Sequence, residues 1–300
     1  MIRKFLIHCL IFTVVMAAGL VLLNTAFNTL RSRMFDMQEA HIALLGNSHV
    51  ETSVNDSILT GSRNFARSAE LAEFMYAKLK LLHKYNSQLD TVYVCFDEMI
   101  PFYKSYVDDI YSPSYYDMLT VSDWINIFRL GGFEYGSTHF ARPFAITKMY
   151  DYMFAARAPE FNLRKTDNIG GYMYLRRDKL QENIRRVKKS GQQPSTQPVS
   201  LYFLDRMAEY CRENDIQLIF ICPPQHPSRG DNQQIYRSLH MSRYSDIPLV
   251  DCIDVTLPDS CYGDISHLNH RGARLFSRFL EDSVIHRHPV VSRIYTNHLK

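Results

Sequence analysis

Apolar and polar positions change their spacing several times between about residue 41 and residue 285. Short apolar runs predict buried strands at residues 41–45, 63–66, 91–96, 217–222 and 248–251. Stretches with apolar residues on one helical face predict helices at residues 68–85, 199–214, 232–239 and 271–285. Strands that alternate with helices are typical of a parallel sheet covered on both faces. We therefore predict an α/β fold with three layers, α/β/α, and a mainly parallel five-stranded sheet.

The N-terminus is apolar over residues 5–23, which carry no formal charge. A run of about 20 apolar residues is long enough to cross a bilayer as a helix. Arg3 and Lys4 precede the run, so the positive-inside rule favours a cytoplasmic N-terminus and an extracytoplasmic bulk, either periplasmic or at the cell surface. A cleaved signal peptide is the alternative, because residues 17–19 are small. The apolar run continues past them, and we favour an uncleaved single-pass anchor in the cytoplasmic membrane.

These patterns divide the chain into an anchor at 1–28, a linker at 29–40, an α/β domain at 41–287 and a tail at 288–300. The domain contains an aromatic-rich insertion at about 101–194, which we expect to hold several helices. Its tyrosines suit a core, a platform for sugar rings or a docking surface for a membrane partner.

Charge and cysteine content exclude some functions. The chain has 34 Lys and Arg against 31 Asp and Glu, spread along its length, so we expect no nucleic-acid partner. No Cys-x-x-Cys or His-x-x-x-His spacing is present, so we expect no metal site, and we expect no cofactor. Cys252 and Cys261 flank a short loop and could form a disulfide in an oxidising compartment, although buried thiols are the alternative.

Two short segments carry residues suited to catalysis. Gly46-Asn47-Ser48-His49 follows the first predicted strand, and Asp264-Ile265-Ser266-His267 lies before the last predicted helix. Parallel strands end at one edge of a sheet, so Ser48 and His267 can face one crevice. A serine hydroxyl needs a base such as imidazole to take its proton, and Asp264 is close enough to orient that imidazole. The pattern predicts Ser48 as nucleophile, His267 as base and Asp264 as orienting acid, although a capping serine and a loop histidine are the simpler alternatives.

These residues also carry a family resemblance. Gly46-Asn47-Ser48 resembles the first block of the SGNH hydrolase superfamily, also called GDSL-like esterases, and Asp264-x-x-His267 resembles its last block. The resemblance implies a flavodoxin-like fold, a Ser48, Asp264 and His267 triad, and the Ser48 amide as an oxyanion donor. The chain is most similar to membrane-anchored members, such as the lipoteichoic-acid D-alanylation protein and the alginate acetylation proteins. Those proteins work beside membrane-bound O-acyltransferases, so the resemblance implies such a partner and an acylated cell-surface glycan as substrate.

The middle blocks of the superfamily are absent from the sequence. Ala66-Arg67-Ser68 stands where the oxyanion glycine would fall, and the third predicted strand ends in Phe96-Asp97-Glu98 instead of Gly-x-Asn-Asp. The side-chain donor of the oxyanion hole is therefore unassigned. One hypothesis is that amides near Ser68 take its place.

Further polar residues follow the predicted strands at the same edge of the sheet. His49 fits a surface position or a contact with substrate or a carboxylate, and Asp97 fits either a sugar contact or a solvated carboxylate. The candidates for substrate contact or the rim of the site are Asn47, His49, Ser68, Asp97, Gln225 and His226.

The sequence thus predicts a membrane-anchored, extracytoplasmic serine O-acyltransferase or acylesterase that acts on a cell-envelope glycan through acyl-Ser48. A catalytically inactive glycan-binding or scaffold subunit of an acylation complex is one alternative, because the oxyanion residues are missing. A lipid esterase is another.

Overall fold

The computed structural model describes residues 2–32, 40–102, 118–141, 171–186, 195–230 and 235–285. The chain forms two compact units. One comprises Met1–Asp36 with Asp109–Asn168, and the other comprises Met37–Asp108 with Ile169–Lys300. The candidate active-site residues all belong to the second unit.

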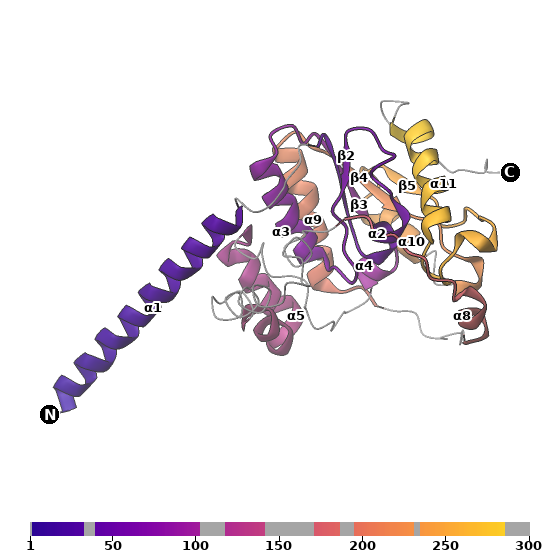
Figure 1. Cartoon of the computed structure of the whole chain (residues 1–300). Coiled ribbons are helices and arrows are strands. Elements are labelled where there is room, and N and C mark those ends of the chain that lie inside the picture. Colours follow the sequence, from indigo (N-terminus) through magenta and orange to yellow (C-terminus); the bar gives the residue numbers. More distant parts are fainter. Residues whose placement is uncertain are drawn as a thin grey trace. The chain divides into compact units, whose positions relative to one another are not determined.

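The second unit is built on one sheet of five parallel strands, which confirms the predicted fold class (Figure 1). The strands lie in the order β2-β1-β3-β4-β5. Their bounds are Ile42–Leu45 for β1, Ser62–Asn64 for β2, Thr91–Cys95 for β3, Gln217–Cys222 for β4 and Leu249–Asp251 for β5. The chain runs outward from β1 to β2 and then returns across β1 to β3. In such sheets the point where the strand order reverses opens a crevice at the carboxyl ends of the strands, here between β1 and β3.

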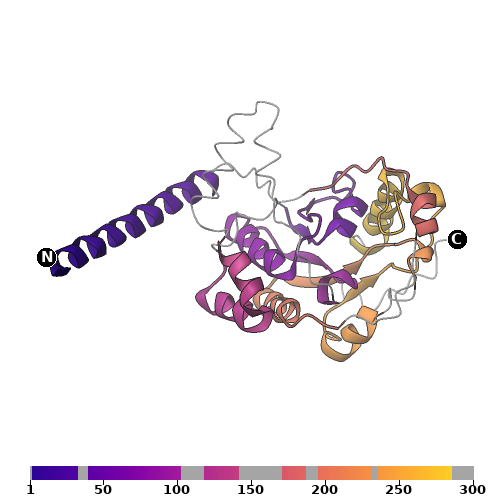
Figure 2. The ribbon, with the colours of Figure 1, turned by 90° about the horizontal axis from the view of Figure 1, so that it is seen from below.

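Helices cover both faces of the sheet (Figures 1 and 2). On one face α3 packs against α9, and on the other α2 packs against α11. The bounds are Ser48–Ser53 for α2, Ala72–Tyr85 for α3, Pro198–Glu213 for α9, Ile235–Arg243 for α10 and His270–Leu280 for α11. Short elements complete the unit: α4 at Met99–Phe102, α8 at Leu180–Arg186, single turns η2 at Pro227–Arg229 and η4 at Asp259–Cys261, and the π-helical turn η5 at Glu281–Ile285.

Apolar strands and aromatic rings fill the space between the layers. Every residue of β3 is buried, as expected for a central strand covered on both faces. The ring of Phe96, directly after β3, stacks on that of Phe220 in β4 with centroids 4.3 Å apart. Gly46 permits a similarly close approach, because a Cβ at that position would lie 2.6 Å from the Cβ of Cys95. The turn after β1 therefore lies directly against β3.

Several predicted boundaries differ from the structure, and those of α3, α10 and α11 differ most. The structure also decides one open alternative. Helix α3 begins at Ala72 instead of residue 68, because residues 65–70 form a loop held by polar contacts. Cys252 and Cys261 are not joined by a disulfide, so of the two alternatives for this pair the structure has thiols.

The first unit contains the N-terminal helix α1 at Ile2–Ser32 and the helix α5 at Val121–Ala141. Residues Ile2–Leu23 of α1 have a mean hydropathy of 2.6 and none of that apolar window is buried, so the helix is long and apolar enough to cross a membrane. A membrane anchor and a signal sequence share these properties. Helix α5 is interrupted at Gly132, whose φ of 85° lies in the left-handed region that glycine adopts readily. The rest of the predicted insertion, apart from 118–141 and 171–186, lies mainly outside the described residues, as does the tail at 288–300.

Candidate active site

The nucleophile candidate Ser48 is the first residue of α2, immediately after the turn that leaves β1. The Oδ1 atom of Asn47 accepts the His49 N–H at 2.9 Å and so caps the helix. The Asn47 carbonyl accepts the Glu51 N–H at 3.0 Å, and the Thr52 hydroxyl donates to the Ser48 carbonyl at 2.8 Å. These bonds fix the backbone on both sides of Ser48.

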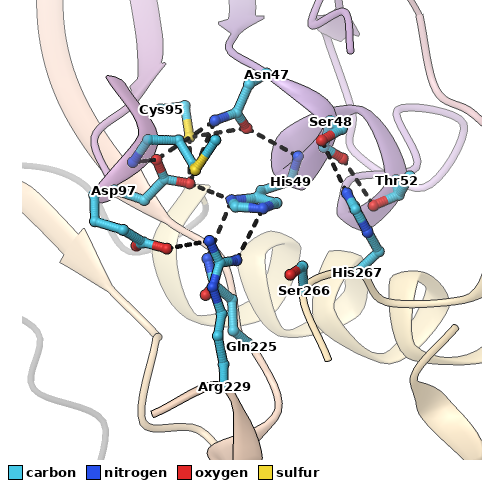
Figure 3. A network of polar contacts seen from close by, with 12 residues as sticks. Asn47, Ser48, His49, Thr52, Cys95, Asp97, Gln225, Arg229, Ser266 and His267 are labelled. Carbon is cyan, nitrogen blue, oxygen red and sulfur yellow. Dashed lines mark hydrogen bonds and ion pairs between the residues drawn. The ribbon is translucent and has the colours of Figure 1, made fainter. Parts of the chain in front are cut away.

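A chain of hydrogen bonds links Ser48 to His267 and His267 to Asp264. Figure 3 shows the bond between Ser48 and His267, two residues that lie far apart in the sequence. The Oγ of Ser48 lies 2.9 Å from Nε2 of His267. The other ring nitrogen, Nδ1, lies 2.8 and 3.0 Å from the two carboxylate oxygens of Asp264. With Nδ1 protonated towards the carboxylate, Nε2 presents its lone pair to the serine hydroxyl, which is the arrangement of a nucleophile, base and orienting acid.

Asp264 is held in the ionised form by several donors. Its Oδ1 accepts the N–H groups of Ser266 at 2.8 Å and His267 at 3.0 Å, and the guanidinium of Arg177 pairs with Oδ2. Burial alone would raise the pKa of Asp264, but the hydrogen bond and charge of His267, the Ser266 amide and Arg177 hold it well below its usual range. The Asp264 carboxylate is therefore ionised at neutral pH.

Beside this triad lies a second histidine and carboxylate pair, His49 and Asp97 (Figure 3). The Asp97 carboxylate contacts Nδ1 of His49 and lies 3.4 and 3.5 Å from Nδ2 of Asn47. His49 is 4% exposed and Asp97 is not exposed at all. His49 is therefore not a surface histidine, and Asp97 is not a solvated carboxylate. The rings of His49 and His267 approach edge to face, with centroids 5.3 Å apart.

Arg229 and Glu98 close this second network. The guanidinium pairs with the Glu98 carboxylate, and its Nη1 lies 3.1 Å from Nε2 of His49, while the Gln225 amide lies 3.1 Å from Nδ1. Burial lowers the pKa of His49 to about 4, although Asp97 opposes the shift. Burial, and then the charge of Asp97, raise the pKa of Glu98 to about 7. At neutral pH His49 is uncharged: it donates through Nδ1 and accepts through Nε2.

In the loop after β2, the amides of residues 65–68 are engaged by other acceptors. The N–H groups of Phe65 and Arg67 donate to main-chain carbonyls at 2.8 and 2.9 Å, and that of Ala66 donates to a side-chain oxygen at 2.9 Å. Both the hydroxyl and the amide of Ser68 are directed at the carboxylate of Glu51 in α2. The hypothesis that amides near Ser68 replace the missing oxyanion donor stays a prediction. In the described part of the chain, by contrast, the Ser48 N–H has no protein acceptor.

His226 lies in the loop after β4, and its ring contacts residues outside the triad. Its Nδ1 accepts the Ser228 N–H at 3.1 Å, its Nε2 lies 3.4 Å from Asp259, and its ring packs on Tyr262. Its backbone N–H donates to the Ile265 carbonyl at 3.1 Å, so the His226 loop supports the loop that carries Asp264 and His267.

The structure thus brings together all three triad candidates, and it joins Asn47, His49, Asp97 and Gln225 in the adjacent network. Their roles in catalysis or substrate contact, and those of Ser68 and His226, remain predictions. Arg177 and Arg229 were missed in the sequence, because both lie outside long periodic elements. Among the described residues, no three histidine, cysteine or carboxylate side chains come together as a metal site would require.

Comparisons with known proteins add a family but no activity. A family model for uncharacterised proteins matches residues 132–288, a little over half of the 300-residue chain. The chain belongs to this family. The region that this uncharacterised family shares includes Asp264 and His267 and begins after Ser48. No curated protein matches the sequence.

Two solved structures resemble the chain at low sequence identity. One, from Bacteroides fragilis, is provisionally described as an acylhydrolase, with 12% identity and a TM-score of 0.38 over 82% of this chain and 89% of that one. The other, from Streptococcus pneumoniae, is provisionally described as a platelet activating factor, with 11% identity and a TM-score of 0.41 over 91% of this chain and 97% of that one. At TM-scores below 0.5, neither likeness bears on the activity of this chain.

Proposed function

We propose that the protein is a membrane-anchored, extracytoplasmic serine esterase or O-acyltransferase of the SGNH type. The observation that carries this proposal is the hydrogen-bonded chain from the Ser48 hydroxyl through His267 to Asp264. A serine hydroxyl is a weak nucleophile until a neighbouring base can take its proton, and a buried carboxylate on the far nitrogen stabilises the imidazolium that results.

The reaction that this arrangement supports has two halves. Nε2 of His267 takes the Ser48 proton while Oγ attacks the ester carbonyl, and the Ser48 N–H, which has no other acceptor in the described residues, is directed at the oxyanion. The imidazolium then returns its proton to the leaving alcohol, which gives acyl-Ser48. Water completes a hydrolase cycle, whereas an acceptor hydroxyl completes a transferase cycle.

The substrate and the location follow from the sequence resemblance and from α1. We propose a small acyl group on a cell-envelope glycan, with a membrane-bound O-acyltransferase as the partner that supplies acyl groups. The apolar helix α1 is consistent with an anchor in the cytoplasmic membrane. Extraction of membranes with alkaline carbonate tests this part, because an anchored chain stays with the lipid and a chain whose leader has been cleaved does not.

Labelling with a fluorophosphonate tests the chemistry. The wild-type protein in detergent is expected to be labelled on Ser48 and to release acetate from an activated ester, whereas Ser48→Ala is expected to do neither. Ser53, a buried serine at the other end of α2, provides the matched control, because Ser53→Ala removes a hydroxyl from the same helix without touching the triad. Equal labelling of wild type and Ser48→Ala would disprove the acyl-serine mechanism.

A second candidate is a non-enzymatic glycan-binding or scaffold subunit of an acylation complex. The observation that favours it is Asp97, which lies just after β3, where the superfamily has a side-chain donor. Asp97 is instead an acceptor for His49 and Asn47. If this candidate holds, the protein binds an acetylated glycan and Ser48→Ala binds it equally well, while neither protein reacts with fluorophosphonate.

A further inference from the structure

The Asp97 carboxylate is the common acceptor for the two residues that flank the nucleophile. It receives the Nδ1–H of His49 on one side of Ser48 and lies within 3.5 Å of the Nδ2 group of Asn47 on the other. Its remaining bonds come from its own loop, where the Met99 N–H donates at 2.9 Å, and from the thiol of Cys95 at 3.5 Å. Asp97 is completely buried, so no solvent competes for these bonds.

This geometry fixes Ser48 from both neighbours at once. The side chain of Asn47 makes two polar contacts: its Oδ1 accepts the His49 N–H at 2.9 Å, and its Nδ2 group faces Asp97. Residues 47 and 49 therefore cannot rotate without breaking contacts to the same carboxylate. The peptide units between them set the direction of the Ser48 Oγ and of the Ser48 N–H.

His49 cannot act as a second general base for Ser48, although its ring lies beside that of His267. Its Nδ1 faces Asp97, and its Nε2 accepts from Nη1 of Arg229 at 3.1 Å. Both ring nitrogens are engaged by groups from the loops that follow β3 and β4. The two imidazoles therefore have different roles: His267 faces the serine hydroxyl, and His49 links the nucleophile turn to the strands beside it.

We propose that Asp97 is a positioning residue for Ser48, which it orients through Asn47 and His49. The inference rests on the proposed serine chemistry. It adds to that chemistry because it assigns a role to Asp97, a carboxylate at the position where the superfamily has the side-chain donor of the oxyanion hole. Asp97 orients the nucleophile and its amide, and it makes no contact with the substrate.

The test compares Asp97→Asn with Asp251→Asn. Asp251 is also a buried aspartate at the carboxyl end of a parallel strand, but it is bound by Tyr236 and Arg237 and has no contact with the nucleophile turn. The measured quantities are the rate constant for fluorophosphonate labelling of Ser48, corrected for the fraction of protein that can be labelled, and kcat and KM for an activated acetyl ester. A loss of folded protein lowers that fraction, whereas misplacement of Ser48 lowers the rate constant.

Asp97→Asn is expected to lower the labelling rate constant and kcat by roughly 10- to 100-fold, with KM changed by less than about threefold, because a displacement of about 1 Å at a nucleophile costs this much. Asp251→Asn is expected to label at the wild-type rate. Labelling of Asp97→Asn at the wild-type rate would overturn the inference, and so would an equal loss in both variants, which would indicate general loosening of the sheet.

His49→Gln provides the same test if Asp97→Asn fails to fold, because it breaks the coupling from the other side. It is expected to reduce the labelling rate constant as Asp97→Asn does, and a wild-type rate would overturn the inference. Wild-type protein that does not react at all would instead overturn the proposed serine chemistry itself, so the two failures are distinguishable.

Discussion

Replacing Asp264 with asparagine changes one oxygen of the orienting carboxylate of the triad into an NH2 group. In the wild type, Oδ1 accepts two backbone N–H groups at 2.8 and 3.0 Å and lies 2.8 Å from Nδ1 of His267, whereas Oδ2 accepts from Arg177 and lies 3.0 Å from Nδ1. The amide oxygen of the substituted side chain best keeps the two backbone bonds, which leaves its NH2 group facing the Arg177 cation and Nδ1. The NH2 group then opposes the guanidinium of Arg177, and it can donate to Nδ1 only if Nδ1 gives up its proton, which favours the tautomer protonated at Nε2.

The expected loss follows from the tautomer. If Nδ1 becomes an acceptor, Nε2 carries the proton and can no longer receive one from Ser48, so the base is lost. Loss of this orienting role costs up to about 10⁴-fold in turnover in serine enzymes of this kind. We expect kcat/KM to fall by about 10³- to 10⁴-fold, which corresponds to about 4–5.5 kcal/mol of activation free energy.

The assay is hydrolysis of an activated acetyl ester by the full chain in detergent, with Asp259→Asn as the control. The Asp259 side chain is 65% exposed and precedes the same triad loop, so its substitution is expected to leave kcat/KM within about twofold. If Asp264→Asn retained more than a tenth of wild-type activity, Asp264 would not control the His267 tautomer.

Three further predictions concern buried groups. Lys78→Met leaves the buried Glu70 carboxylate without its 2.7 Å ion-pair partner and is expected to lower the free energy of unfolding by about 3–5 kcal/mol in urea titrations, whereas a loss below about 1 kcal/mol would contradict it. Because burial lowers the pKa of His49 to about 4, the unfolded chain takes up a proton between about pH 6.5 and 4 that the folded chain does not, so His49 reduces stability as the pH falls through this window. Glu98, whose pKa burial raises to about 7, acts in the opposite direction, so the effect is measured as the difference in Tm between wild type and His49→Gln, which is expected to change across the window. Gly46→Ala places a methyl group 2.6 Å from a β3 side chain and is expected to cost about 1–3 kcal/mol and to slow Ser48 labelling; an unchanged Tm would show that the turn can move.

Patterning was sufficient to predict the sheet, because its strands are short apolar runs bounded by polar or small residues. Strand β4 matches the predicted 217–222 at both ends. The start of α3 was misjudged, since Ser68 and its neighbours fit a helix by composition but are held in a loop by Lys78 and Glu51. Such tertiary contacts override local propensity and leave no periodic signal.

The triad residues could be proposed from order and spacing, whereas the surrounding network could not. The sequence pattern around a carboxylate after a strand is the same whether the carboxylate faces solvent or a buried histidine. The burial of Asp97 therefore could not be predicted from its position. Arg177 lies in residues 171–179, which have neither helical nor strand periodicity, and its contact with Asp264 depends on how that segment crosses the domain. Pairings of this kind depend on the path of the chain in space.

The distance along the chain between the nucleophile and its base has a consequence for biosynthesis. Ser48 and His267 are 219 positions apart, and the Asn55 N–H just after α2 donates to the Ser277 hydroxyl of α11 at 2.8 Å. A polypeptide made from its N-terminus exposes Ser48 early, but the helix and loop that activate this serine are among the last segments to emerge. Contacts of such long range form late in folding. Under the proposed mechanism, the Ser48 hydroxyl gains its base only when α11 and the preceding loop that carries His267 dock, so an incomplete chain is expected to have no esterase activity.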